Sequence, residues 1–128
     1  MDYYFSKTLE TLFDEAVQKT TDALKREGFG VISEINIHEK LKEKLNVDFR
    51  RYKILGACNP PYAYKALQAE DKIGTMLPCN VIVQEISENQ IEVAAVNPVA
   101  SMMAIQNSIL ENIAKEITVK LQSVINAL

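Results

Sequence analysis

The two cysteines of the chain are its side chains best suited to chemistry. Each is followed directly by asparagine, in "GACNPPYAY" at 56–64 and in "LPCN" at 77–80. Cys58 ends a predicted strand just before a predicted helix, where exposed amides and the helix dipole stabilise a thiolate. Cys79 opens the next long strand. If the two strands lie antiparallel and adjacent, their thiols lie close together, which permits a site.

Two neighbouring thiols can form a metal clamp, a redox couple or a ligand contact. A structural zinc normally has four protein ligands, whereas this chain offers two thiols and one distant histidine, His38, unless a dimer doubles the count. Met102 and Met103 add soft sulfur, which favours copper(I). The simpler interpretation is packing, because unpaired cysteine and methionine commonly fill cores. The sequence leaves these alternatives open.

Several other chemistries have no supporting motif. The chain has no phosphate-binding loop, dinucleotide fingerprint, nucleophile elbow or pair of histidines. His38 lies in "HEKLKEKL", where alternating charges are typical of a solvated helix face. The net charge of −3 supplies no positive field for a phosphate backbone, so nucleic acid is not an expected partner.

The hydrophobic pattern predicts one α+β domain over residues 1–128. Alternating or continuous apolar residues predict five strands, at 3–6, 29–37, 52–58, 80–86 and 90–96. Apolar residues at steps of three and four predict helices, at 8–24, 38–45, 59–71 and 108–127, with a helical turn after Asn97. The order β-α-β-α-β-α-β-β-α predicts a sandwich in which helices cover a mixed sheet of about five strands.

Turn residues mark where these elements begin and end. Gly28 stands where a left-handed helix C-terminus is expected, and Asn59 is expected to cap the helix that begins with two prolines. Ser108 and Glu111 have the spacing of a capping box. Tyr62 and Tyr64 point to different sides of their helix, so one is expected to line a pocket and the other to cover the core.

Two apolar faces carry further expectations. In the strand at 29–37, the face that begins with Phe29 and includes Ile35 is expected to enter the core. The last helix has a wide apolar face for so small a domain, so part of it is expected to face a second copy of the chain.

The segment 93–110 carries no charge, but polar residues and Pro98 interrupt it, so no membrane span is expected. The start of the chain lacks the basic region and apolar run of a signal peptide. Together with two cysteines, too few for a disulfide scaffold, this predicts a cytoplasmic protein.

The stretch "YKILGACNPPYAYKALQAEDKIGTMLPCNVIV", with "EGFGVISEINIHEKLKEKL" before it and "VNPVASMM" after it, closely resembles the domain-of-unknown-function 302 family. The likeness covers nearly the whole chain. It implies a compact α+β domain that forms a homodimer and has no established activity. The chain matches the cysteine-bearing version of the pattern at Cys58, Pro60, Cys79 and Asn80.

We therefore expect a small homodimeric module that binds or senses a small molecule or a metal ion where three turns meet. Its expected site residues are Cys58, Asn59, Cys79, Asn80 and Met102. The two cysteines would hold a soft metal ion, the asparagines would cap backbone or donate hydrogen bonds, and Met102 would close the pocket. The alternative is a thiol-dependent redox enzyme with Cys58 as nucleophile. A third hypothesis is a structural subunit that interacts through its last helix.

Overall fold

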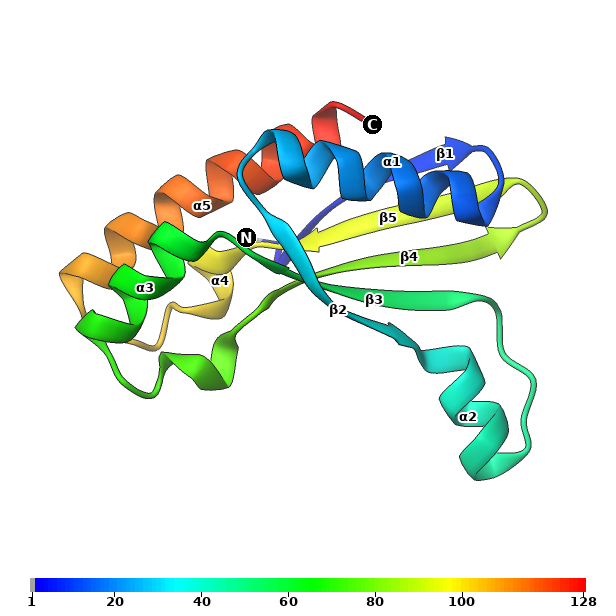
Figure 1. The fold of residues 1–128 in the computed structure, drawn as a ribbon, viewed down its shortest axis with the longest axis horizontal. Helices are drawn as coiled ribbons and strands as arrows, with labels where there is room; N and C mark the ends of the chain where they lie inside the picture. The colour runs from blue at the N-terminus through cyan, green and yellow to red at the C-terminus, as the bar shows by residue number, and fades with distance from the viewer. Residues whose placement is uncertain (1) are drawn as a thin grey trace.

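Five strands form one antiparallel sheet in the computed structural model, which describes residues 2–128. They are β1 (Tyr4–Glu10), β2 (Gly30–Asn36), β3 (Tyr52–Cys58), β4 (Cys79–Ser87) and β5 (Gln90–Val96). Their order across the sheet is β1-β5-β4-β3-β2. The predicted α+β class and strand number are confirmed, but no pairing within residues 2–128 is parallel. The reason is that β1 and β2, which run the same way, lie at opposite edges of the sheet (Figure 1).

Helices cover one face of this sheet (Figure 1). The helices of the structure are α1 (Phe13–Arg26), α2 (Ile37–Leu45), α3 (Pro60–Ala69), α4 (Pro98–Ser101) and α5 (Ser108–Asn126), with a 3₁₀ turn, η1 (Ile73–Met76). Both α1 and α5 pack on β5, and α3 packs against α5. By contrast α2 lies beyond the end of the sheet and buries none of its residues. The second face of the sheet carries no helix layer within the part of the chain that the structure describes.

The core lies between the sheet and α1 and α5. Alternate residues of the central strands point into it, and they are fully buried: Leu55, Val81, Val83, Ile91 and Val93. From α5, Leu121 and Val124 meet them and are also 0% exposed. Burying each such side chain contributes about 1.5–3 kcal/mol, so this layer stabilises the frame that holds the turns at the ends of β3 and β4.

The first strand is longer than predicted. It continues to Glu10, where Leu9 lies opposite Ile91 of β5. The predicted start of the first helix at Thr8 is therefore wrong, because the spacing of Thr8 and Leu9 suits both a strand and a helix and pairing with β5 decides between them. The predicted left-handed end of that helix is confirmed, since Gly28 has φ +88° and Phe29 N–H donates to the Leu24 carbonyl over 2.9 Å.

The second strand contains a bulge that changes which side chains face the core. Its pairing with β3 shifts between Val31 and Ser33. Phe29 is 2% exposed, whereas Ile35, predicted on the same buried face, is 42% exposed. The prediction is wrong beyond Val31, because one extra residue in a strand turns every later side chain to the opposite face.

The last helix buries most of its apolar row inside its own chain. Leu110, Ile113, Ile117, Leu121 and Val124 all belong to the core. These residues pack on α1, α3 and the sheet. Ile109, which begins the predicted row, is 57% exposed, so contact of part of this face with a second copy stays a prediction.

The N-terminus of α5 is capped by a different residue from the one predicted. Asn107, not Ser108, caps its start, because the Asn107 side chain accepts hydrogen bonds from the N–H groups of Ile109 and Leu110.

Among the described residues, no helix has the length and apolar character that crossing a membrane requires.

Candidate functional site

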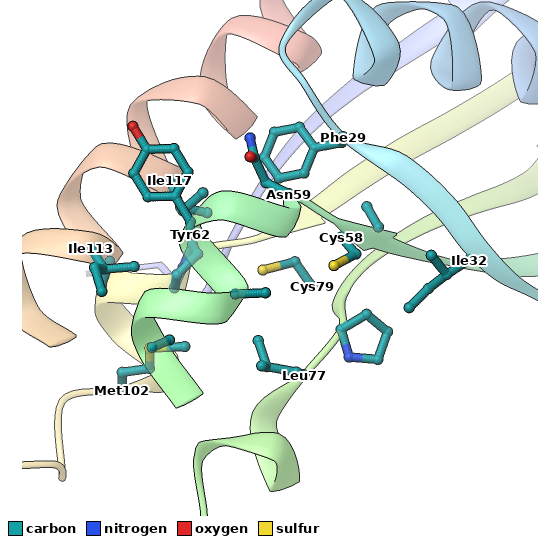
Figure 2. A pocket seen from close by; sticks show the side chains of 16 residues that line it. Phe29, Ile32, Cys58, Asn59, Tyr62, Leu77, Cys79, Met102, Ile113 and Ile117 are labelled. Carbon is teal, nitrogen blue, oxygen red and sulfur yellow. The ribbon is translucent and has the colours of Figure 1, made fainter. Parts of the chain in front are cut away.

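A cavity of about 210 Å³ opens where β3 ends and β4 begins. Helix α3 lines one side of the cavity, and α4 and α5 line another (Figure 2). Phe29, Tyr62, Leu77, Ile113 and Ile117 form much of its wall. Nearly all of the lining is apolar, so the few polar groups in it determine what chemistry the cavity offers.

Cys58 and Cys79 both line this cavity as free thiols, and each is half-buried. The two strands pair as the sequence predicted, with Cys79 directly opposite Ala57, the neighbour of Cys58. Strict alternation would put Cys58 and Cys79 on opposite faces of the sheet. Cys58 is the last residue of β3, however, and where the chain turns into α3 both sulfur atoms face the cavity (Figure 2).

The Cys79 thiol is held in its neutral form. Burial, with a smaller contribution from the nearby Cys58, raises the pKa of Cys79 from 9.0 to about 11. A buried thiolate loses hydration that the apolar lining does not replace. Cys79 is therefore a thiol at neutral pH and a poor nucleophile on its own.

Alkylation of Cys79 should consequently require strongly basic solution. The Cys58→Ser variant keeps the burial that is the larger cause of the raised pKa of Cys79, so its rate of reaction with iodoacetamide is expected to keep rising well above pH 9.0, toward about pH 11. Because the unfolded chain loses this proton near pH 9.0, the Cys79 contribution to stability is present below that pH and is lost between about 9 and 11. Cys79→Ser should remove this part of the pH dependence of unfolding, and an alkylation rate that levels off near pH 9 would contradict the assignment.

Asn59 is the N-cap residue of α3, as predicted, but its side chain accepts no hydrogen bond from the helix. Its side-chain Nδ2 donates to the Glu27 carbonyl over 3.2 Å, which ties the start of α3 to the end of α1. A Cβ on Gly28 would approach Asn59 Nδ2 to 3.2 Å, so the glycine also makes room for this contact. The predicted position of the cap is confirmed, but the side-chain cap is absent because Pro61 has no N–H to donate and the side chain is held at Glu27 instead.

The start of α3 also gives Cys58 fewer hydrogen-bond donors than expected. The first two helical residues are Pro60 and Pro61, which have no N–H group. The Ala63 N–H is used by the Asn59 carbonyl at 3.0 Å. The predicted stabilisation of a Cys58 thiolate by exposed helix amides therefore loses most of its donors.

The remaining predicted site residues divide between two places. Met102 lines the cavity, but Figure 2 shows it beside Ile113, at the other end from Cys58. Asn80 lies outside the cavity: it is exposed and pairs with Gly56 on the uncovered face of the sheet. The structure thus brings four of the five predicted residues into one cavity, while Asn80 lines a neighbouring hollow together with Cys79 and Met102.

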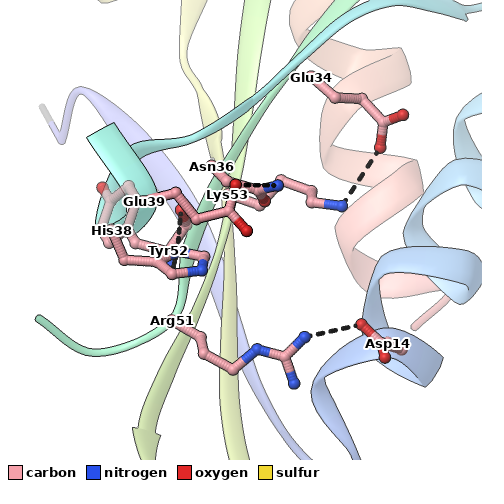
Figure 3. A network of polar contacts seen from close by, with 8 residues as sticks. All are labelled: Asp14, Glu34, Asn36, His38, Glu39, Arg51, Tyr52 and Lys53. Atoms are coloured by element: carbon pink, nitrogen blue, oxygen red, sulfur yellow. Dashed lines mark hydrogen bonds and ion pairs between the residues drawn. The ribbon is translucent and has the colours of Figure 1, made fainter. Parts of the chain in front are cut away.

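A metal site of the usual kind is not formed within one chain. Among residues 2–128, no three His, Cys, Asp or Glu side chains are grouped so that they could hold an ion. His38 is at the opposite end of β3, where its Nδ1 accepts a hydrogen bond from Tyr52 N–H over 2.9 Å (Figure 3). Ion pairs from Lys53 to Glu34 and from Arg51 to Asp14 surround that end. In the cavity, the thiols of Cys58 and Cys79 are the side chains suited to binding a metal ion.

Parts of the cavity wall carry no sequence signal of their own. Ile113 and Ile117 fit the apolar row of α5, and nothing in that spacing separates a core position from a cavity wall. Of the two tyrosines, Tyr62 lines the cavity as one of them was expected to do. Tyr64 is 66% exposed, so the expectation that the other covers the core is wrong.

A family model described as "Domain of unknown function DUF302" matches residues 5–128. The chain belongs to the DUF302 family. A solved structure, that of the uncharacterized conserved protein DUF302 from Bacillus stearothermophilus, is similar over 99% of this chain and 98% of its own, with 26% sequence identity and a TM-score of 0.90. No curated protein matches the chain.

Membership of DUF302 confirms the family resemblance that the sequence shows over nearly the whole chain. It also confirms the α+β fold, because the match to the Bacillus stearothermophilus structure spans every element of the sheet. The family description assigns no activity, so the chemistry of the DUF302 cavity rests on the residues of this chain.

Proposed function

We propose that this DUF302 domain binds a small, mostly apolar molecule in the cavity between β3, β4 and α3. The observation that carries the proposal is an apolar space of about 210 Å³ with two thiols facing into it. Apolar cavities of about 150 Å³ take up benzene, so this one suits a ligand of one or two small rings or a short branched chain. Contact with Phe29, Tyr62 and Ile117 would bury the apolar body of such a ligand.

Thiol-dependent catalysis is less well supported than binding. The titratable groups among the lining residues are Cys58, Cys79 and Tyr62, and none is an ordinary general base near neutral pH. A soft metal ion held by Cys58 and Cys79 is the other occupant that the donor set suits. Because Met102 lies at the other end of the cavity, the third sulfur would not join them without movement.

Binding can be measured with indole as the probe. The chain has no tryptophan, so the fluorescence of indole can be followed without a tryptophan background. Ala63→Phe should lower the indole affinity by at least about tenfold, because Ala63 lines the cavity and a phenyl ring there would fill it. Gln68→Phe is the matched control, since it adds the same ring to an exposed position of α3.

Equal affinity of the two variants, or no binding by the wild-type protein, would contradict the proposed site. Native mass spectrometry of the same samples tests the other occupant. A bound metal ion that disappears when Cys58 and Cys79 are both replaced by alanine would favour the metal over the apolar ligand.

The uncovered face of the sheet supports a second proposal, that the domain is a homodimer. Side chains from four neighbouring strands form one apolar row across this face: Ile35, Ile54, Ile82 and Ala94. None of them is fully buried within the chain, and no helix covers them (Figure 1). A second copy placing the same row against this one would remove both from water, as a two-fold symmetric contact requires.

The dimer proposal predicts opposite results for two substitutions. Ile82→Glu should convert a two-chain particle into single chains, because it places a charge in the centre of the row. Val119 is 65% exposed on α5, so Val119→Glu should leave the mass of the particle unchanged. Sedimentation velocity distinguishes the two, and a wild-type protein that sediments as a single chain would rule the dimer out.

A further inference from the structure

The two cysteines of this chain lie at a backbone spacing that a disulfide can bridge. Antiparallel pairing puts Cys79 opposite Ala57, so strand spacing places the Cα atoms of Cys79 and Cys58 about 6 Å apart. Disulfides join Cα atoms that are about 4.4–6.8 Å apart. Their sulfur atoms also face the same space, as Figure 2 shows.

The position of this pair is held firmly. The Leu77-Pro78 segment approaches β3 so closely that a Cβ on Gly56 would lie 2.7 Å from Pro78 Cγ. Pro78 directly precedes Cys79, and Gly56 lies two residues before Cys58. Close packing of these neighbours limits how far the two thiols can separate.

We propose that Cys58 and Cys79 form a reversible disulfide that regulates ligand binding in the cavity. The regulatory part rests on the proposed binding function, whereas formation of the bond does not. Both thiols are half-buried rather than enclosed, so a small oxidant can reach them. A peroxide is the class of oxidant that fits, because it reacts directly with a thiolate and needs no separate base from the protein.

The reaction balances with hydrogen peroxide as the oxidant. The Cys58 thiol first releases its proton to solvent, and the thiolate sulfur then bonds to one peroxide oxygen while the O–O bond breaks. The departing hydroxide takes up a proton from solvent, which replaces the one released, and becomes water. The Cys79 sulfur then attacks the resulting sulfenic acid, forming the S–S bond and breaking the S–O bond, and its proton leaves with the oxygen as a second water. We assign the first step to Cys58 because Cys79 is held protonated. A small thiol returns both residues to the reduced form and is itself oxidised to a disulfide.

The bond changes the wall that a ligand touches. In the reduced protein both sulfur atoms face the cavity. A disulfide brings them to about 2.05 Å from each other, so both side chains turn from the ligand toward one another. It also removes both S–H donors, which are among the few polar groups of the lining.

Peroxide treatment of the reduced full-length protein tests the bond itself. We expect the intact mass to fall by two hydrogen atoms and the tryptic fragments that contain Cys58 and Cys79 to remain linked, although Lys65 and Lys72 lie between them. Cys58→Ser and Cys79→Ser should each abolish this link. Thiols that remain free to react with iodoacetamide in denaturant after peroxide treatment would overturn the proposal.

Indole binding by the same samples tests the regulation. The oxidised protein should bind indole at least about tenfold more weakly than the reduced protein, and dithiothreitol should restore the affinity. Unchanged or higher affinity in a fully disulfide-bonded sample would overturn regulation and leave the binding function intact. Failure of the reduced protein to bind indole would instead contradict the proposed function, and regulation with it, while the mass measurement still decides whether the bond forms.

Discussion

Replacing Leu121 with alanine should lower the free energy of unfolding by about 2–5 kcal/mol. Leu121 lies in α5 and is 0% exposed, at the centre of the contact between this helix and the sheet. Removing its isobutyl group leaves a space that close-packed neighbours fill only in part. Since small domains are stable by about 5–15 kcal/mol, this one change should consume a large share of the total.

Val119→Ala is the matched control for this prediction. Val119 lies two residues earlier in the same helix and is 65% exposed, so its replacement should change the unfolding free energy by no more than about 0.5 kcal/mol. Urea unfolding followed by circular dichroism at several protein concentrations measures both. If Val119→Ala cost as much as Leu121→Ala and the loss depended on concentration, α5 would be an interface between chains after all.

Gly56→Ala is expected to cost about 1–3 kcal/mol of stability. A Cβ at this position would lie 2.2 Å from Ser33 Oγ and 2.7 Å from Pro78 Cγ. The serine side chain can rotate away, whereas the proline ring is bonded into the backbone and can move only together with the segment that leads into β4. Because Pro78 lines the cavity next to Cys79, the same change should also weaken indole binding.

Gly30→Ala provides the comparison, because a Cβ there would meet nothing within 4 Å. It should be neutral or stabilise the protein by a few tenths of a kcal/mol, since alanine restricts the unfolded chain more than glycine does. Combining Gly56→Ala with Ser33→Gly should recover only part of the loss, as the contact with Pro78 remains. Thermal unfolding of the wild-type protein, the two single glycine variants and the double variant measures these changes in stability. Full recovery of stability in the double variant would show that Pro78 can move freely.

Local signals were enough to place most elements. The strands at 52–58 and 90–96 have the bounds that the alternation predicted. Gly28 ends α1 in the left-handed region because glycine has no Cβ to clash there. Asn97 caps α4 through its own Oδ1, which accepts from Val99 N–H over 3.1 Å. These features depend on residues a few positions apart, so a single sequence carries them.

Features that depend on distant residues were misjudged. The bulge in β2 turns Ile35 outward because pairing with β3 sets the register there. The Asn59 side chain donates to the Glu27 carbonyl, just after α1, instead of accepting a hydrogen bond from the first turn of its own helix. The spacing of the apolar row of α5 is the same for a face that meets the chain's own sheet and for one that meets a second copy, and only the packing shows that most of the row meets α1, α3 and the sheet.

By itself the sequence determined the elements, the α+β class and the turns that carry Cys58 and Cys79, because periodicity, caps and prolines act over short stretches of chain. Tertiary structure alone decided that these two thiols share one apolar cavity with Met102 at its other end, while Asn80 faces away. The physical reason is that a cavity is a property of packing. It arises where strands and helices far apart in the chain fail to fill the space between them, and no local pattern records that.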